Sequence, residues 1–268
     1  MIEVKNLTFA YKVDKILDDI SFVAGDGRLI AVLGPNGAGK STLFKCILGF
    51  LKGYKGNIYI NGKNISEMSR AQMAREAAYI PQSEIPVFNY TVFDTVLMGT
   101  TGMLSPVSSP GEEQMNIAKE AIEYLGIGYM EDRGINEISG GERQLALLAR
   151  AMAQKARLLI MDEPTANLDY GNQQKVLHAV KKMADSGYTI LLSTHNPEHA
   201  LQYASHVLAI KDHKIIADGR AEEFLNEELI ERIYGIKVKI TDVEIEGKIV
   251  RSCVPAGYLS QDRLMNNY

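Results

Sequence analysis

The sequence predicts an α/β fold around a mostly parallel β-sheet, and three short apolar segments carry this prediction. Leu29–Leu33 ends in a glycine-rich turn, and helical spacing of apolar residues follows over residues 40–51. Two further apolar segments, residues 157–161 and 189–193, flank a helical segment at residues 172–186. The uninterrupted apolar run Leu29–Leu33 is typical of a strand buried on both faces. Strands that alternate with helices indicate a parallel sheet covered by helices.

The N-terminal segment and the segment after the first helix predict additional strands. Ile2–Tyr11 alternates between apolar and polar residues, and residues 16–22 form a second predicted strand behind a charged turn. Residues 53–64 combine Gly and Asn with alternating Ile and Tyr, which is typical of a β-hairpin. Near the C-terminus, residues 237–255 are rich in β-branched side chains, so a smaller hairpin is expected there.

The middle of the chain predicts helices instead of strands. Helical spacing of apolar residues occurs near residues 92–98, 111–125 and 141–155. A loop rich in Ser, Pro and Gly is expected at residues 100–110. Because strands precede and follow this stretch, which runs from about residue 83 to residue 157, we expect a helical insertion into the sheet.

Composition and charge limit the function classes. Of the 268 residues, 46% are hydrophobic and 23% are charged, which are ordinary values for a protein with a packed core. The formal net charge of −4 offers no broad basic field, so binding of nucleic acid through bulk electrostatics is not expected. No run approaches the roughly 18 consecutive apolar residues of a membrane-spanning helix, and the N-terminus shows no secretory signal. We therefore expect a chain that stays in the cytosol unless a partner holds it at a membrane.

A glycine-rich loop follows the strand Leu29–Leu33. Gly34, Gly39, Lys40 and Ser41 satisfy the pattern G-x-x-x-x-G-K-[ST] between a strand and a helix, which favours a phosphate-binding loop over a turn with a surface lysine. Glycines allow a tight turn whose N–H groups point at phosphate oxygens, and the helix start adds its positive dipole end. We expect Lys40 to reach the β- and γ-phosphates and Ser41 to ligate Mg²⁺. The predicted residues of this nucleotide site are Gly34, Pro35, Asn36, Gly37, Ala38, Gly39, Lys40, Ser41 and Thr42.

An acidic pair follows another of the apolar strands. Asp162 and Glu163 come directly after residues 157–161, at the carboxyl end of the strand, where open α/β sheets bind ligands. Asp162 is expected to support Mg²⁺, and Glu163 to polarise the water that attacks the γ-phosphate. By itself the pair fits equally well with solvated acids in an ordinary turn. Downstream of a phosphate loop, catalysis becomes the favoured interpretation.

A segment that begins with Ser139, Gly140, Gly141 and Glu142 opens a predicted helix ahead of the acidic pair. A serine and glycines at a helix start offer free N–H groups and a capping hydroxyl to an anion, although in isolation a simple capped helix would be favoured. With this segment, the chain resembles the ATP-binding-cassette (ABC) ATPases, whose signature is LSGGQ. Ile138 and Glu142 replace its Leu and Gln, and Glu142 keeps acceptor oxygens but loses the amide donor.

The resemblance covers about residues 1–235 and implies roles for further residues. Gln82 resembles the Q-loop glutamine that senses Mg²⁺ and the membrane subunit, and Asp169 resembles the D-loop aspartate. His195 resembles the switch histidine that contacts the γ-phosphate. Tyr11 stands where the family stacks an aromatic ring on adenine. The implied catalytic residues are Glu163 and His195, and the implied Mg²⁺ ligands are Ser41, Gln82 and Asp162.

The resemblance also implies a fold, cofactors and partners. The fold is that of a P-loop NTPase cassette with a RecA-like, mostly parallel sheet, an N-terminal antiparallel β subdomain and an inserted α-helical subdomain. Residues 1–235 would form the ATPase domain, and residues 236–268 a small β or irregular extension. ATP and Mg²⁺ would lie between two copies paired head to tail, with the signature of one copy on the ATP of the other. Two polytopic permease subunits would hold the pair at the cytoplasmic face of the cell membrane, and an extracytoplasmic substrate-binding protein would act through them.

Two features narrow the resemblance to importers of metal chelates. A single cassette without a membrane span is typical of importers with separate permease subunits. Residues 91–99 and 168–173 are similar to cassettes that import iron–siderophore, haem, cobalamin and related chelates, while residues 100–103 replace the subgroup's Arg-x-Pro-His. Two alternatives stay open: a soluble ABC ATPase of the iron–sulfur assembly type, and an ATP-gated binding switch with little turnover. Glu163 and His195 argue against the switch, because a binding module needs neither.

Overall fold

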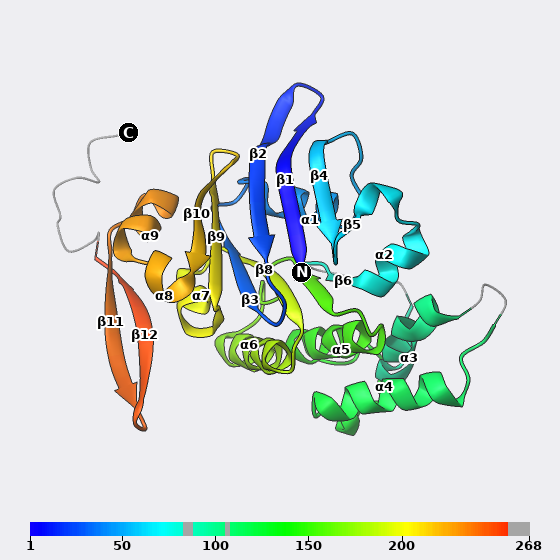
Figure 1. The fold of residues 1–268 in the computed structure, drawn as a ribbon. Coiled ribbons are helices and arrows are strands. Elements are labelled where there is room, and N and C mark those ends of the chain that lie inside the picture. The colour runs from blue at the N-terminus through cyan, green and yellow to red at the C-terminus, as the bar shows by residue number, and fades with distance from the viewer. Residues whose placement is uncertain (83–87, 105–107, 257–268) are drawn as a thin grey trace.

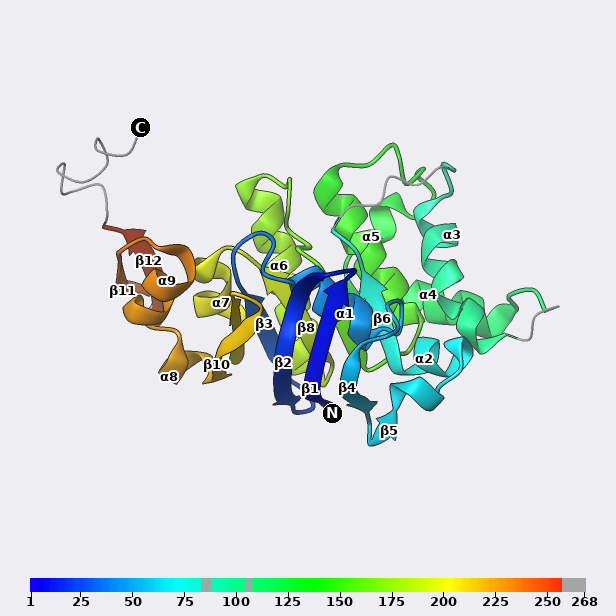
Figure 2. The ribbon, with the colours of Figure 1, turned by 90° about the horizontal axis from the view of Figure 1, so that it is seen from above.

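Two β-sheets face each other across one helix, and further helices cover the far side of the larger sheet (Figures 1 and 2). This arrangement comes from a computed structural model, which describes residues 1–82, 88–104 and 108–256. It confirms the predicted ABC cassette fold with its antiparallel N-terminal sheet, mostly parallel core sheet and helical region. Three predicted segments lie partly outside the described residues: 83–157, 100–110 and 236–268.

The smaller sheet is antiparallel and has four strands in the order β2-β1-β4-β5. Alternation places the apolar side chains of β1 on the inner face, as the sequence predicts. The predicted strand at residues 16–22 is two residues longer at each end, because its ladder with β1 runs from the partners Ile2 and Ala24 to Tyr11 and Asp14. The strands are β1 (Ile2–Tyr11), β2 (Asp14–Ala24), β4 (Lys55–Ile60) and β5 (Lys63–Asn64).

The larger sheet has six strands in the order β10-β9-β3-β8-β7-β6. All neighbours are parallel except β10, which pairs antiparallel with β9. Every residue of β3, β7 and β8 is buried, and for β3 this confirms the prediction of a strand covered on both faces. The strands are β3 (Leu29–Leu33), β6 (Ala77–Ile80), β7 (Leu158–Met161), β8 (Thr189–Thr194), β9 (His206–Lys211) and β10 (Lys214–Arg220).

Helix α1 (Lys40–Ile47) lies between the two sheets and buries its apolar face against both. The prediction of a helix over residues 40–51 is too long. The chain turns back after α1 because the N–H groups of Phe50 and Leu51 both donate to the carbonyl of Lys45, at 2.9 and 3.2 Å.

The described residues between β6 and β7 form helices and connecting turns, and α3, α4 and α5 enclose an apolar cluster of their own. The first part of the predicted loop at residues 100–110 is instead a 3-10 helix. Its threonine hydroxyls donate to backbone carbonyls, Thr100 to Leu97 and Thr101 to Met98, at 2.8 Å each. The limits of an inserted subdomain stay a prediction. The elements are α3 (Val92–Leu97), η2 (Met98–Met103), α4 (Glu112–Tyr124), η3 (Gly128–Met130) and α5 (Gly140–Ala153).

The remaining helices cover the edges of the larger sheet. Helix α6 packs with α5 on its far face, and α7 and α9 cover the β9 side. The sequence patterns predict none of η1, α2, α7, α8, β9, β10 and α9, several of which are short. Within the described residues, no helix has the length and apolar character needed to traverse a lipid bilayer. The helices are η1 (Ile65–Glu67), α2 (Arg70–Glu76), α6 (Tyr170–Asp185), α7 (Pro197–Tyr203), α8 (Ala221–Phe224) and α9 (Glu227–Tyr234).

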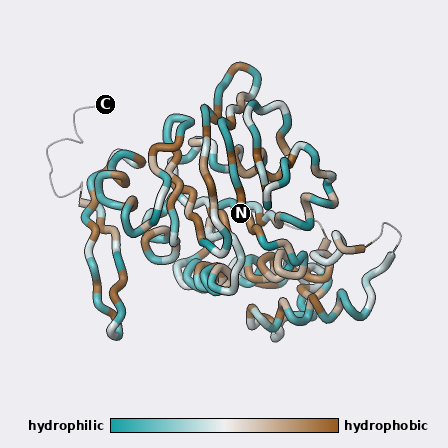
Figure 3. The backbone as a smooth tube through the Cα atoms, in the orientation of Figure 1, coloured by the Kyte–Doolittle hydropathy of each residue, from teal (hydrophilic) through white to brown (hydrophobic). Residues whose placement is uncertain are grey.

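A β-hairpin projects from the end of the molecule that carries α9 (Figure 1). It consists of β11 (Val238–Ile245) and β12 (Lys248–Pro255), which pair over all eight residues of each strand. The predicted hairpin at residues 237–255 is therefore confirmed. Hydrophobic stretches lie on both of its strands (Figure 3), and the part nearest the molecule packs on α7 and α9.

Candidate functional site

The glycine-rich loop wraps around a buried lysine at the end of β3. Lys40, the first residue of α1, is only 6% exposed, and its Nζ donates to the carbonyls of Gly34 at 2.8 Å and Pro35 at 3.1 Å. Gly39 has φ 101° and precedes the helix directly. A side chain there would be strained and its Cβ would come within 2.8 Å of the Ile16 carbonyl oxygen, so the turn requires glycine. The loop thus places an ammonium group beside the free N–H groups of a helix start.

Glu163 lies at the centre of the side chains that follow three neighbouring strands. Its Oε1 is 3.7 Å from the Nζ of Lys40, and its Oε2 accepts a hydrogen bond from Nε2 of Gln82 at 3.3 Å. The same Oε2 lies 3.3 Å from Nδ1 of His195. Gln82 follows β6, Glu163 follows β7 and His195 follows β8, so the order of parallel strands gathers residues from three distant parts of the chain.

A buried serine joins the two acidic residues. Ser193, in β8, is fully buried, and its Oγ donates to Oδ1 of Asp162 at 2.7 Å and accepts the N–H of Glu163 at 2.8 Å. Glu163 has φ 45°, which non-glycine residues seldom adopt, and the serine hydroxyl holds it there. The sequence patterns did not single out Ser193. A serine directly after three apolar residues of a buried strand was the available signal, because a buried hydroxyl needs a partner.

The charges of this group combine one buried ammonium, that of Lys40, with two carboxylates. Burial lowers the pKa of Lys40, and the carboxylates of Glu163 and Asp162 oppose that shift. The buried ammonium of Lys40 attracts a nearby anion more strongly than the same charge in water would, because the protein interior has a lower dielectric constant. We refer to Lys40, Gln82, Asp162, Glu163 and His195 as the phosphate-loop group.

Other predicted residues of the nucleotide site come from the end of β1, from the loop itself and from the start of α1. Tyr11 ends β1, is 45% exposed, and contacts the ring of Phe9 edge to face with ring centroids 4.9 Å apart. Ser41 and Thr42 form the half-buried first turn of α1, and Asn36 is exposed. The structure places Asn36, Ser41 and Thr42 in the loop or directly after it, and the roles of all four residues stay predictions.

The start of α5 is closed by a reciprocal capping box. Oγ of Ser139 accepts the N–H of Glu142 at 3.3 Å, and Oε2 of Glu142 accepts the N–H of Ser139 at 2.9 Å and its hydroxyl at 2.8 Å. The hydroxyl of Tyr129 donates to the other oxygen, Oε1, at 3.0 Å. These hydrogen bonds, with Ser139 first, lower the pKa of Glu142, so this residue is a held carboxylate.

The predicted D-loop residue lies beside this helix start. Asp169 caps α6 and accepts the N–H of Asn172 at 2.9 Å and its Nδ2 at 2.7 Å. The held Asn172 side chain lies so close to Gly141 that an added Cβ would come within 2.5 Å of its Cγ. We refer to Ser139, Gly140, Gly141, Glu142 and Asp169 as the signature group. Across the residues that the structure describes, no hydrogen bond or ion pair joins it to the phosphate-loop group.

Comparison with known proteins identifies the family. The profile described as "ABC transporter" matches residues 17–166, which is more than half of the chain. The chain belongs to the ABC transporter ATPases. An ABC transporter ATP-binding protein of Haemophilus influenzae is 34% identical over 252 residues, covering 94% of this chain and 96% of that protein. A Helicobacter pylori protein named for iron chelatin transport is 39% identical over 217 residues, or 80% of this chain and 85% of the relative.

Solved structures agree with this family. The structure of an inward-facing ABC transporter, described as of proposed metal-chelate type, has a TM-score of 0.84 and 28% identity, with 95% of this chain and 96% of that chain covered. The cassette therefore binds ATP and couples its hydrolysis to transport, and cassettes of this family pair with one another and with permease subunits. The predictions of family, fold and ATPase activity are confirmed.

A side chain that the sequence patterns did not single out links two regions of this cassette. Nδ2 of Asn89, in the segment after Gln82, donates to Oε1 of Glu137 at 2.8 Å. Its Oδ1 accepts the N–H of Asn136 at 2.9 Å. The segment after the Q-loop is thereby bonded to the segment that leads into the signature. Since these partners lie 47 and 48 residues apart, no local pattern could have indicated the pairing.

Proposed function

We propose that this cassette is the ATP-hydrolysing subunit of an importer for a metal or a metal chelate such as iron–siderophore, haem or cobalamin. The proposal is supported by relatives named for metal transport. Besides the iron chelatin protein of Helicobacter pylori, these include a zinc transport protein of Treponema pallidum, 36% identical over 90% of this chain, and a manganese transport protein of Listeria innocua, 34% identical over 87%.

The phosphate loop would hold the nucleotide. Lys40 and the loop N–H groups bind the β- and γ-phosphates, and the exposed ring of Tyr11 stacks on adenine. Ser41, Gln82 and Asp162 hold Mg²⁺, which supplies charge neutralisation at the phosphates when bound. The donors fit this ion, because hydroxyl, amide and carboxylate oxygens are the ligands it prefers. Ser193 occupies one oxygen of Asp162, so the carboxylate keeps lone pairs for a cation.

The position of Glu163 is the single observation that carries the hydrolytic role. Its carboxylate lies within 3.3–3.7 Å of polar atoms of Lys40, Gln82 and His195. Glu163 would orient the attacking water and accept its proton, and His195 would contact the γ-phosphate. The N–H of Glu163 donates to the hydroxyl of Ser193, and this hydrogen bond fixes the backbone from which the carboxylate extends. The carboxylate therefore requires less reorganisation during the reaction.

The signature group would complete the site of a second copy. Ser139, Gly140 and Gly141 lie at the start of a 14-residue helix, whose positive dipole end suits the γ-phosphate of the ATP bound by the other protomer. Asp169 supports that helix start through Asn172. The functional unit is therefore a head-to-tail homodimer, and ATP is part of its interface.

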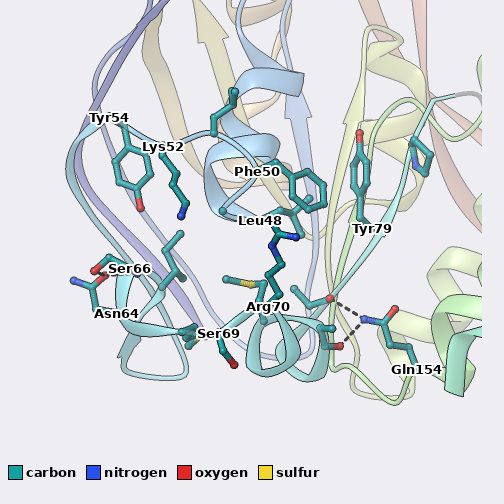
Figure 4. Close-up of a pocket in the computed structure, with 18 of the residues that line it drawn as sticks. Leu48, Phe50, Lys52, Tyr54, Asn64, Ser66, Ser69, Arg70, Tyr79 and Gln154 are labelled. Atoms are coloured by element: carbon teal, nitrogen blue, oxygen red, sulfur yellow. Dashed lines mark hydrogen bonds between the residues drawn. The ribbon is translucent and has the colours of Figure 1, made fainter. Parts of the chain in front are cut away.

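A groove beside the Q-loop would receive a permease subunit. It has a volume of about 1120 Å³ and is bordered by the segment after α1, by α2, by the end of β6 with Pro81, and by α5. The rings of Phe50 and Tyr79 meet edge to face at 5.8 Å in this groove, and Figure 4 shows Arg70 near Phe50 and Lys52 near Tyr54. An apolar groove with basic residues fits an amphipathic cytoplasmic helix.

This docking would hold the pair of cassettes at the cytoplasmic face of the membrane. Two permease subunits form the path, and an extracytoplasmic binding protein delivers the substrate to them. Co-purification with polytopic membrane subunits separates this importer from a soluble assembly-type ATPase.

The substitution Glu163→Gln tests the hydrolytic role. It keeps the size of the side chain and removes the base, so turnover should fall about 100- to 10,000-fold while ATP still binds. Steady-state phosphate release and calorimetric ATP titration measure the two effects separately. Unchanged turnover would remove Glu163 from the proposed role.

A further inference from the structure

The carboxylate of Glu142 accepts three hydrogen bonds at the start of α5. Two come from Ser139, one from its N–H and one from its hydroxyl, at 2.9 and 2.8 Å. The third comes from the hydroxyl of Tyr129 in η3, at 3.0 Å. Where LSGGQ carries a neutral amide, this chain carries a carboxylate, which is the stronger acceptor. The substitution therefore changes what the Ser139 hydroxyl is bonded to.

The Ser139 hydroxyl has one proton and two acceptors that compete for it. It now donates to Glu142 Oε2. If the signature binds the γ-phosphate of ATP on a second copy, as proposed above, the same proton is needed for a phosphate oxygen. The Glu142 charge also lies in the first turn of α5, where it offsets part of the positive helix end that attracts the phosphate. The Glu142 carboxylate therefore opposes the pairing of two copies of the chain unless another hydrogen-bond donor replaces the Ser139 hydroxyl.

Tyr129 supplies such a donor from outside the helix. It lies 13 residues before Glu142 in the chain, and its ring is 69% exposed while its hydroxyl reaches Oε1. The positive charge of Arg133 also acts on this carboxylate. With Oε1 held by the tyrosine, the carboxylate stays in its capping position and keeps the backbone N–H of Ser139 when the serine hydroxyl leaves.

We propose that Tyr129 is a positioning residue of the signature, whose hydroxyl holds Glu142 so that the Ser139 hydroxyl can transfer its hydrogen bond to ATP on a second copy. The inference rests on the proposed pairing of signature and ATP. Removal of the Tyr129 hydroxyl leaves the Ser139 hydroxyl as the side-chain donor to Glu142 within the described residues. The carboxylate then retains that proton more strongly, and ATP-driven pairing weakens. A Glu142→Gln chain has a weaker acceptor, so the tyrosine should matter little in it.

The test is a double-mutant cycle for dimerisation, in a Glu163→Gln background that retains ATP. The dimer dissociation constant is measured by sedimentation with ATP and Mg²⁺ for the parent, Tyr129→Phe, Glu142→Gln and the combined variant. One charge-assisted hydrogen bond corresponds to about a tenfold change. Tyr129→Phe should raise the dissociation constant about tenfold when residue 142 is Glu, and by less than about twofold when it is Gln. The affinity of the Tyr129→Phe monomer for ATP should not change.

Tyr124→Phe is the matched control. This substitution also removes hydroxyl hydrogen bonds, but none of them involves Glu142. The Tyr124 hydroxyl contacts the Lys182 carbonyl at 3.1 Å and Ser186 Oγ at 2.7 Å. Dimerisation of Tyr124→Phe should equal that of the parent. If the parent dimerises with ATP and Tyr129→Phe has the same dimer dissociation constant, the inferred role of Tyr129 is overturned, while the proposed pairing stands. An equal loss with Glu and with Gln at position 142, accompanied by a lower melting temperature, would reduce Tyr129 to a structural role and also overturn it. A parent that stays monomeric with ATP would instead refute the proposed pairing itself.

Discussion

The phosphate-loop group and the signature group are assembled in opposite ways. In the first, side chains from several strands converge: Glu163 lies within 3.7 Å of Lys40 and within 3.3 Å of both Gln82 and His195. In the second, Ser139 and Glu142 satisfy each other at the start of α5, and Asp169 caps the neighbouring helix α6 through bonds to Asn172. One group is ordered by the tertiary fold, and the other mainly by local hydrogen bonding.

This difference indicates how the two groups respond to a ligand. The charged side chains of the phosphate-loop group are already in place before the nucleotide binds, so binding requires little rearrangement there. The signature must exchange an internal hydrogen bond for one to a phosphate, so its affinity for a second copy depends on how firmly Glu142 is held. Nucleotide binding and pairing are therefore separable by mutation.

The substitution Lys40→Ala should have the largest effect on nucleotide binding. The ammonium is buried against the loop, and its loss removes charge-assisted hydrogen bonds to phosphate, each worth about 1.5–3 kcal/mol. Calorimetry should show ATP affinity lower by about 100-fold. Lys45→Ala is the matched control, because Lys45 is exposed on the same helix and should leave affinity unchanged. Equal affinity of Lys40→Ala and the parent would contradict the site.

The substitution Gly141→Ala should disturb the signature group alone. Its new Cβ would come within 2.5 Å of the Asn172 side chain, and overpacking of this kind costs about 1–3 kcal/mol. ATP-driven dimerisation of a Glu163→Gln parent should weaken about tenfold in sedimentation. Adding Asn172→Ala provides room and should restore part of the pairing. If Gly141→Ala lowered nucleotide affinity as much as Lys40→Ala does, the two groups would not be independent.

The sequence predicts the phosphate loop and the capped start of α5, but not the contacts that either group makes with distant parts of the chain. The loop from Gly34 to Ser41 is a continuous strand–turn–helix pattern, so local chemistry is sufficient to find it. The convergence of Gln82, Glu163 and His195 depends on the strand order β6-β7-β8, which no local pattern specifies. Ser193 was missed for the same reason, because its two partners lie 30 and 31 residues away.

Secondary structure shows the same division between local and long-range causes. Buried strands such as Leu29–Leu33 were predicted with their observed limits, because an apolar run directly encodes burial on both faces. Helix α1 ends at Ile47 through backbone bonds to Lys45, and the apolar spacing beyond it gives no sign of that stop. The partnership of Tyr129 with Glu142 likewise needs the tertiary placement of η3.

As the pH falls, stability should be lost first near the carboxyl ends of the strands of the larger sheet and only later at the signature group. This effect should be smaller than the effects of the substitutions above. His199 in α7 is buried next to Thr194, with Nδ1 3.5 Å from its hydroxyl, and burial lowers its pKa below 6.5. Its neutral form therefore contributes stability that is present above pH 6.5 and is lost as the pH falls from there through the lowered value. The hydrogen bonds from Ser139 lower the pKa of Glu142 below 4.5, so its contribution is lost only below about that pH.

Urea unfolding between pH 7.5 and 5 measures this order. The free energy of unfolding should decrease below pH 6.5, with a slope of at most about 1.4 kcal/mol per pH unit from one histidine. His199→Gln should remove that part of the slope, whereas Glu142→Gln should leave it in place, because Glu142 stays ionised over the whole range. A slope that His199→Gln retains would assign the titration to another group. If Glu142→Gln removed the slope, the signature group and the carboxyl ends of the strands would lose stability in response to the same proton. That result would contradict the independence inferred from their separate hydrogen bonds.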